Sequence, residues 1–135
     1  LFDIEIDGIE AGRIDFELFG EAAPKSVNNF LAFAQVNSTN IIGIKGVVSI
    51  GSIQINGLWA ATSKNKMERP LTIYENGKKE TIPAEQNNLK FIEPYLLCST
   101  ANDEGETGSQ FFITLKSLPP LNGSKNTIIG RVLQG

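Results

Sequence analysis

The segment GSQFFIT, residues 108–114, lies in the part of the chain with the strongest strand signals. Its aromatic and β-branched residues favour a strand from Gln110 to Leu115. Two comparable runs, Tyr95 to Ser99 and Thr127 to Leu133, lie on either side of it, and turns that carry Gly, Asn or Pro separate all three. The pattern therefore predicts three short strands joined by turns.

The first residues of the chain predict a β-hairpin. Phe2 to Ile6 alternates apolar and acidic residues, and Asp7-Gly8 follows as a turn signal. From Arg13 to Leu18 the alternation resumes and places the three apolar residues of that run on one face. We expect two strands with one buried face.

A helix is predicted directly after this hairpin. Pro24 suits the first helical turn, and the apolar residues that follow recur at the i, i+3, i+4 and i+7 spacing of an amphipathic helix: Val27, Phe30, Leu31 and Ala34. We expect a helix over residues 24–36 that ends near Asn37.

The middle of the chain carries weaker signals. Ile42 to Ile55 is rich in β-branched residues and glycine, which favours one or two strands with a bend or bulge between them. Gly57 to Asn88 is mostly polar, with Asn76-Gly77 as a turn signal and Leu71 to Tyr74 as a strand-like run. We expect most of this second segment to be surface loop.

The composition bounds the class of protein. Many short strands with one or two helices favour a barrel, and no linker or repeat divides residues 1–135, so we expect a single domain. The formal net charge is -3 and no basic cluster favours nucleic acid as a partner. The apolar stretch Ile41 to Ile55 is interrupted and too short to span a membrane. With no histidine and a single cysteine, Cys98, we expect no disulfide framework, Cys/His metal site or cofactor.

Two blocks of the sequence resemble the cyclophilins. Residues 2–34 are similar to the opening of that family: a hairpin, a G-R-x-x-F-E-L-F strand and a helix that begins at a proline. Residues 94–135 resemble its later signatures in the same order: STAN at Ser99 to Asn102, GSQFFIT, LNG at Leu121 to Gly123, and IIGRVLQG. The chain is therefore identified as a divergent member of the cyclophilin-type peptidyl-prolyl cis-trans isomerases.

The resemblance implies a mainly-β fold, a closed antiparallel barrel of eight strands with one or two capping helices. Members of the family continue past the equivalent of residue 135. The resemblance therefore implies that a C-terminal part of the barrel is missing from this chain.

The resemblance also implies an isomerase whose key arginine is replaced. In cyclophilins an arginine donates to the proline nitrogen as the amide loses its resonance. The family stretch F-H-R-I-I-P-G-F-M corresponds to residues 40–48 when Lys45-Gly46 is matched to its P-G pair, which places Ile42 at the arginine. The phenylalanine and methionine of the pocket then become Val47 and Val48. We expect no catalytic residue here and only weak or lost isomerase activity.

The second block implies a groove for proline-containing peptide. Phe112 matches the floor of the family's proline pocket and Leu121 matches a wall, while the family's tryptophan and histidine are replaced by Pro120 and Asn126. These changes predict poor binding of cyclosporin, the inhibitor of the family. The candidate groove residues are Val47, Val48, Ala101, Asn102, Gln110, Phe112, Leu121 and Asn126.

Each of these residues also has a purely structural interpretation. Phe112 is equally consistent with a core aromatic on a strand. Asn102 and Gln110 suit a turn and a strand edge without any ligand. Cys98, within an apolar run, is interpreted as a small core residue.

Two functions remain open from the sequence. The favoured one is a non-catalytic or weakly catalytic domain that binds a protein or proline-containing peptide, or serves as a structural module in a multi-subunit assembly. The alternative is an active isomerase that assists protein folding. The replaced arginine favours the first, and the intact GSQFFIT block favours the second.

Overall fold

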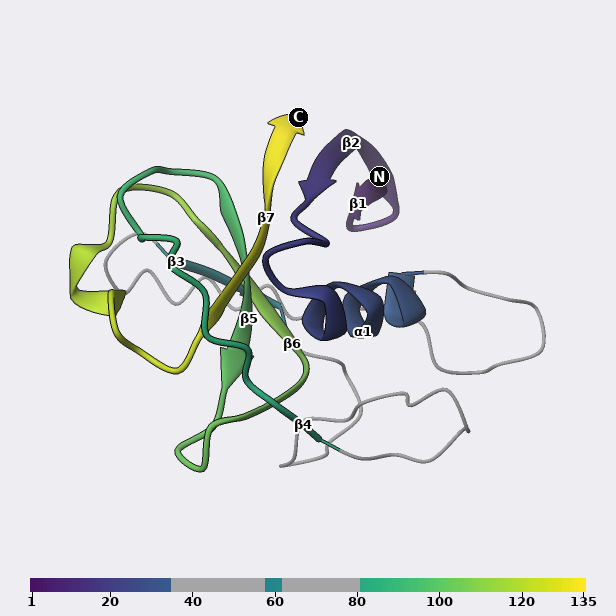
Figure 1. Ribbon diagram of the computed structural model, residues 1–135. Helices are drawn as coiled ribbons and strands as arrows, with labels where there is room; N and C mark the ends of the chain where they lie inside the picture. The colour runs from purple at the N-terminus through teal and green to yellow at the C-terminus, as the bar shows by residue number, and fades with distance from the viewer. Residues whose placement is uncertain (35–57, 62–80) are drawn as a thin grey trace.

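The computed structural model describes residues 1–34, 58–61 and 81–135, and every structural statement below concerns these residues (Figure 1). Several sequence-based predictions lie outside them: the strands within Ile42 to Ile55, the turn at Asn76-Gly77 and the run Leu71 to Tyr74. Val47, Val48 and Ile42 also lie outside the described residues.

The predicted N-terminal hairpin is confirmed. Strands β1 (Phe2–Ile6) and β2 (Ile9–Leu18) pair antiparallel through a two-residue turn. Asp7 and Gly8 both have positive φ, 54° and 81°, which is the geometry of a type I′ turn. Strand β2 begins at Ile9, earlier than the sequence predicts. A bulge opposite Ile4 and Glu5 interrupts the apolar alternation before Gly12, so the first part of the strand shows no clear pattern in the sequence.

Helix α1 (Pro24–Ala34) forms where the apolar spacing predicts it. Proline is tolerated at the first helical position because the amide hydrogen it lacks would have no partner within the helix. Val27 and Phe30 are buried against the sheet, and Leu31 packs beside them. The predicted helix is thus confirmed as far as Ala34, and its expected end lies outside the described residues.

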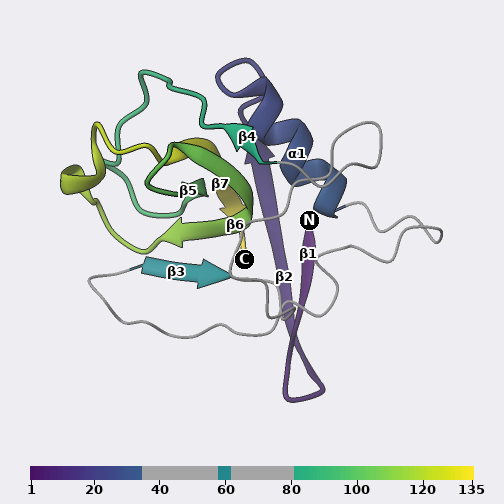
Figure 2. The ribbon, with the colours of Figure 1, turned by 90° about the horizontal axis from the view of Figure 1, so that it is seen from below.

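A curled antiparallel sheet of seven strands carries the helix on one side (Figures 1 and 2). The order along the sheet is β1-β2-β7-β5-β6-β3, and β4 also pairs with β6. The remaining elements are β3 (Leu58–Ala61), β4 (Ile82–Pro83), β5 (Leu96–Ala101), β6 (Glu106–Thr114), the 3-10 helix η1 (Pro119–Leu121) and β7 (Thr127–Gln134). The described residues therefore form a half-barrel, and the mainly-β fold is confirmed.

The three strands predicted around GSQFFIT are all present as β5, β6 and β7. Strand β6 begins at Glu106, earlier than expected, because Thr107 pairs with Ala101 on one side and with Ile82 on the other. Pairing to two neighbours thus extends the strand through Glu106 and Gly108, residue types that are depleted in strands.

The sequence did not predict two short strands that lie between Gly57 and Asn88. Leu58–Ala61 and Ile82–Pro83 are strands, and both pair with β6. They are four and two residues long, too short to show a periodic pattern, so only pairing with a distant strand defines them.

Alternate side chains of β5, β6 and β7 pack into two separate hydrophobic clusters. The α1-side cluster consists of Ala23, Val27, Phe30, Leu97, Phe111 and Ile129. The Phe112 cluster consists of Phe91, Leu96, Cys98, Phe112, Leu118 and Ile128, with Phe19 and Leu121 packed against it. Neighbours such as Phe111 and Phe112 point to opposite faces because side chains alternate along a strand. In the described part of the chain, no helix is long and apolar enough to cross a membrane.

Candidate functional site

Phe112 lies in the middle of β6 and forms the centre of the Phe112 cluster. Its backbone is opposite Cys98 on β5 and opposite Ala60 on β3. The side chain is only 3% exposed. Phe112 therefore packs as a core residue, as its structural interpretation predicts. A ligand could reach its ring only by displacing the apolar side chains packed against it.

An unexpected aromatic residue stacks on Phe112. The rings of Phe91 and Phe112 lie 6.3 Å apart between centroids, with planes inclined by 17°. Phe91 is also 3% exposed, although it belongs to no helix or strand. Sequence reasoning missed Phe91, because an isolated aromatic in a polar segment carries no periodic signal.

The backbone of Phe91 is held by the loop that contains η1. Its amide donates to Oδ1 of Asn122 at 2.7 Å. Its carbonyl accepts from the Leu118 amide at 2.7 Å and from Oγ of Ser117 at 3.4 Å. Phe91 is thus tied to both ends of the short segment that presents Leu121.

Leu121 lies beside the Phe112 cluster, as the sequence predicts. It is half-buried at the end of η1, whose turn is closed by a bond from the Leu121 amide to the Leu118 carbonyl. Pro120, which stands at the family's tryptophan position, is exposed. The structure therefore brings Phe112 and Leu121 together, while their role in binding a ligand stays a prediction.

Ala101 and Asn126 are joined directly. The Ala101 amide donates to Oδ1 of Asn126 at 3.0 Å, and the Asn126 amide donates to Oγ of Ser124 at 3.4 Å. Asn126 immediately precedes β7, so this bond ties the end of β5 to the start of β7. Its side-chain oxygen is already occupied by a backbone donor.

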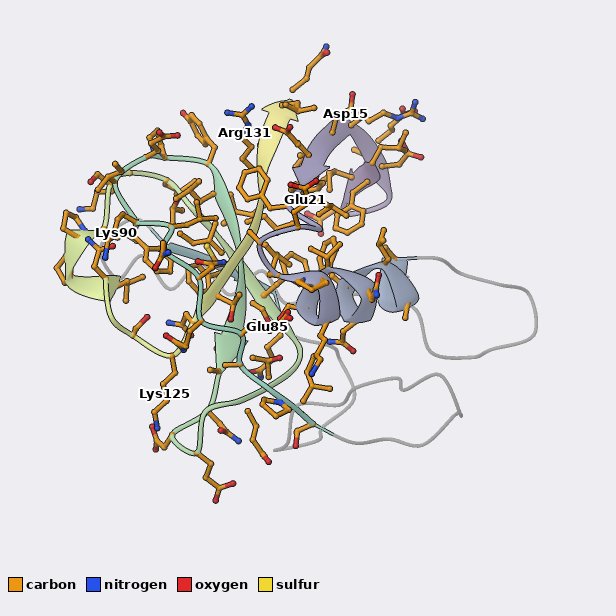
Figure 3. The ribbon with its side chains drawn as sticks, viewed as in Figure 1. Asp15, Glu21, Glu85, Lys90, Lys125 and Arg131 are labelled. Atoms are coloured by element: carbon orange, nitrogen blue, oxygen red, sulfur yellow. The ribbon has the colours of Figure 1, made fainter. Side chains whose placement is uncertain are left out.

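Asn102 organises the turn between β5 and β6. Its Oδ1 accepts from the Glu106 amide at 2.9 Å, and its own amide donates to the Glu106 carbonyl at 2.9 Å. Gly105 closes the turn with φ of 81°, a left-handed value that glycine adopts without a steric penalty. Lys125 reaches this loop and donates to the Asp103 carbonyl (Figure 3). The turn interpretation of Asn102 is thus satisfied.

Gln110 lies two residues before Phe112 on β6, in the part of the strand where the pairing with β5 is irregular. It is half-buried, and within the described residues its side chain makes no hydrogen bond. Gln110 thus differs from Asn102 and Asn126, whose side-chain oxygens accept hydrogen bonds from backbone amides of the described residues.

Two ion pairs lie on the exposed surface of the described chain. Arg13 bonds Asp3 at 2.7 Å, and Arg131, labelled in Figure 3, bonds Glu17 at 2.6 Å. Within the Phe112 cluster, burial raises the pKa of the Cys98 thiol, so the thiol stays protonated. The described residues contain no group of acidic, cysteine or histidine side chains that could hold a metal ion.

The half-barrel with its two apolar clusters defines a mainly-β protein, and comparison with known proteins makes the class specific. The family model described as "Cyclophilin type peptidyl-prolyl cis-trans isomerase/CLD" matches residues 1–135. The chain therefore belongs to the cyclophilin family.

Named relatives and a solved structure agree with this membership. Peptidyl-prolyl cis-trans isomerase D of Cryptococcus neoformans is 35% identical over 134 residues, which is 98% of this chain and 35% of that protein. The protein of the same name from Kluyveromyces lactis is 33% identical over 141 residues, 99% of this chain and 37% of that protein. The chain thus spans about a third of the length of these relatives.

The structural relative is a cyclophilin type peptidyl-prolyl cis-trans isomerase from Cryptosporidium parvum, crystallised in the presence of the dipeptide Ala-Pro. The TM-score is 0.66 at 25% sequence identity, and the match covers 92% of this chain and 74% of that chain.

Proposed function

We propose that this cyclophilin domain has weak or lost isomerase activity and acts as a protein-binding or structural module within a larger assembly. Its partner is a protein or a proline-containing peptide. The observation that carries the proposal is the absence of arginine from residues 40–53, NIIGIKGVVSIGSI.

The missing arginine matters because the barrier to cis-trans rotation of the peptide bond is high. Rotation about a peptide bond costs about 18–20 kcal/mol, since twisting breaks the amide resonance. A donor aimed at the proline nitrogen stabilises the twisted amide, and losing one such donor commonly lowers the rate by about 10² to 10³. Lys45 is the cation within this stretch, and its ammonium lacks the planar fork of a guanidinium. Of the arginines that the structure describes, Arg13 and Arg131 are engaged with surface carboxylates.

The cover over Phe112 supports the same proposal. A proline pocket needs its floor to be accessible, yet Phe112 is 3% exposed and Phe91 stacks on its ring. The side-chain oxygens of Asn102 and Asn126 accept hydrogen bonds from backbone amides of the domain itself. Few groups are thus left free to hold a peptide tightly, although Gln110 and Leu121 still border the site.

Peptide binding itself is supported by the structural relative. That protein was crystallised in the presence of Ala-Pro, and its fold matches 92% of this chain. We therefore assign the same class of ligand to the face that carries Phe112, Leu121 and Gln110, with modest affinity.

The alternative function is an active isomerase. It is favoured by the relatives of 33% and 35% identity, which are named as isomerases. The two functions differ in one measurement, the rate of cis-trans exchange in an Ala-Pro test peptide. We expect a rate at least about 10² below that of an ordinary cyclophilin at equal concentration. Catalysis within about tenfold of that cyclophilin would show that another donor serves.

The binding role has its own test. Partners are captured with the wild-type domain, with Phe112→Ala, and with Val47→Asp combined with Val48→Asp. We expect partner contact to survive Phe112→Ala and to be lost in the double variant, because aliphatic surfaces suit protein docking. If Phe112→Ala alone abolishes association while circular dichroism shows an intact fold, the groove is a working peptide reader and the structural role is wrong.

A further inference from the structure

Phe91 connects the two sides of the candidate groove. Its ring stacks on Phe112, which would form the floor, with 6.3 Å between ring centroids. Its backbone is bonded to Asn122 and Leu118, which flank the wall residue Leu121. Residues on β6 and around η1 are thus held in register by one aromatic residue of an irregular segment that is distant from both in the sequence.

This connection has a physical consequence for the Phe112 ring. The torsion that rotates a phenylalanine ring has a broad energy minimum, so neighbouring groups set the ring plane. A stacked ring is worth roughly 0.5–1.5 kcal/mol beyond the area it buries, and this interaction depends on geometry. The nearly parallel stack with Phe91 therefore restricts the orientation of Phe112.

We infer that Phe91 is a positioning residue of the peptide groove, which fixes the ring of Phe112 and the wall residue Leu121 relative to each other. The inference rests on the proposed binding of proline-containing peptide at this face. In this role Phe91 acts indirectly, through the Phe112 ring on which it stacks and through Leu121, which packs against the same cluster.

The α1-side cluster supplies a matched control for this role. Phe30 is buried to 8% exposure and packs edge-to-face on Phe111, with 5.4 Å between ring centroids. Phe30→Leu removes the same atoms from a core of similar kind but leaves Phe112 untouched. A stability effect common to any buried phenylalanine is therefore measured by Phe30→Leu.

The first test compares wild type, Phe91→Leu and Phe30→Leu in titrations with the Ala-Pro dipeptide, followed by the NMR shifts of the Leu121 methyl groups. We expect Phe91→Leu to weaken binding by about fivefold, because the released Phe112 ring must be ordered again when peptide binds, and to alter the Leu121 shifts before peptide is added. Phe30→Leu should leave both the affinity and the Leu121 shifts unchanged.

A second pair of variants leaves the ring in place and alters only its anchor. Asn122→Ala removes the acceptor of the Phe91 amide, whereas Asn122→Asp retains an oxygen at the same position. We expect Asn122→Ala to weaken peptide binding in the same direction as Phe91→Leu, and Asn122→Asp to bind within about twofold of wild type. This pair also decides the matter if Phe91→Leu fails to fold.

The outcomes separate this inference from the proposed function. Wild-type affinity in both Phe91→Leu and Asn122→Ala, or an equal loss in Phe30→Leu, would overturn the positioning role. Absence of any Ala-Pro binding by the wild type would overturn it too, while leaving a partner-binding module in place. Isomerase activity near that of an ordinary cyclophilin would overturn the proposed function and leave the role of Phe91 intact.

Discussion

The carboxylate of Glu85 accepts a hydrogen bond of 2.7 Å from the backbone amide of Ser26, in the first turn of α1 (Figure 3). Its second oxygen accepts from the Lys25 amide at 3.2 Å. The Glu85 carbonyl in turn accepts from Oγ1 of Thr127 at 2.9 Å, at the start of β7. One residue of an irregular segment thus caps the helix and joins it to the sheet.

We predict that Glu85→Ala destabilises the domain by about 1–2 kcal/mol, because two helix amides lose their acceptor and the negative charge leaves the positive end of the helix. Glu85→Gln should cost less, since an amide oxygen still accepts. Urea unfolding with a common m-value measures both changes. Glu104→Ala, at an exposed position of the β5–β6 turn, is the control. Glu85→Ala as stable as Glu104→Ala would show that water replaces the carboxylate.

The fold was predicted best where the pattern is local. The hairpin, α1, β5, β6 and β7 all follow from alternation or helical spacing within a few residues. Strands β3 and β4 were missed because their existence depends on β6, which lies more than twenty residues from either. Pairing of that kind overrides local preference and leaves no mark in a short window.

The candidate site was predictable to the extent that it lies in the signature blocks. Phe112 and Leu121 come together as the resemblance to cyclophilins implies. The link between Ala101 and Asn126 joins two predicted residues, but its bond from side chain to backbone could not be read from their separation in sequence. Phe91 escaped prediction because its contacts to Asn122 and Phe112 are all distant in sequence.

Because of Cys98, the free energy of unfolding of the domain depends on pH in the alkaline range. Burial raises the pKa of the thiol above its ordinary value of 9.0, because the thiolate would lose its hydration. Above about pH 9 the unfolded chain releases a proton that the folded state keeps. The free energy of unfolding therefore falls as pH rises through this range, by up to about 1.4 kcal/mol per pH unit.

We predict that Cys98→Ala removes this component of the pH dependence. Urea titrations at about pH 8 and about pH 10 should show that wild type loses roughly 1 kcal/mol more between the two than the variant does. Lysine and tyrosine ionisation contributes equally to both proteins and cancels in the comparison. Identical losses would mean that the thiol ionises in the folded state as readily as in the unfolded one.

We predict poor binding of cyclosporin. The family's tryptophan position is Pro120, which is exposed and has no N–H donor, and Phe112 is almost fully buried. Calorimetry should give a dissociation constant weaker than about 1 µM, a free energy of binding smaller in magnitude than about 8 kcal/mol. An ordinary cyclophilin serves as the positive control. Submicromolar binding by this chain would contradict the interpretation that its pocket is covered.

Gly130 allows β2 and β7 to approach each other closely, and replacing it should be costly. It lies opposite Leu18 on β2 and Leu97 on β5. A Cβ atom at this position would lie 2.3 Å from the carbonyl oxygen of Glu17, a backbone atom that cannot rotate away. Gly130→Ala therefore forces the two strands apart, and we predict a loss of about 2–3 kcal/mol in the free energy of unfolding.

Gly20 offers the matched control for this substitution. A Cβ there meets nothing within 4 Å, and the backbone shows no left-handed φ. Gly20→Ala should thus be neutral or stabilise the domain by about 0.4–1 kcal/mol, because alanine restricts the unfolded chain. Urea unfolding of both variants measures the difference. If Gly130→Ala is as stable as Gly20→Ala, the strands β2 and β7 can separate without cost, and the close contact at Glu17 does not constrain the sheet.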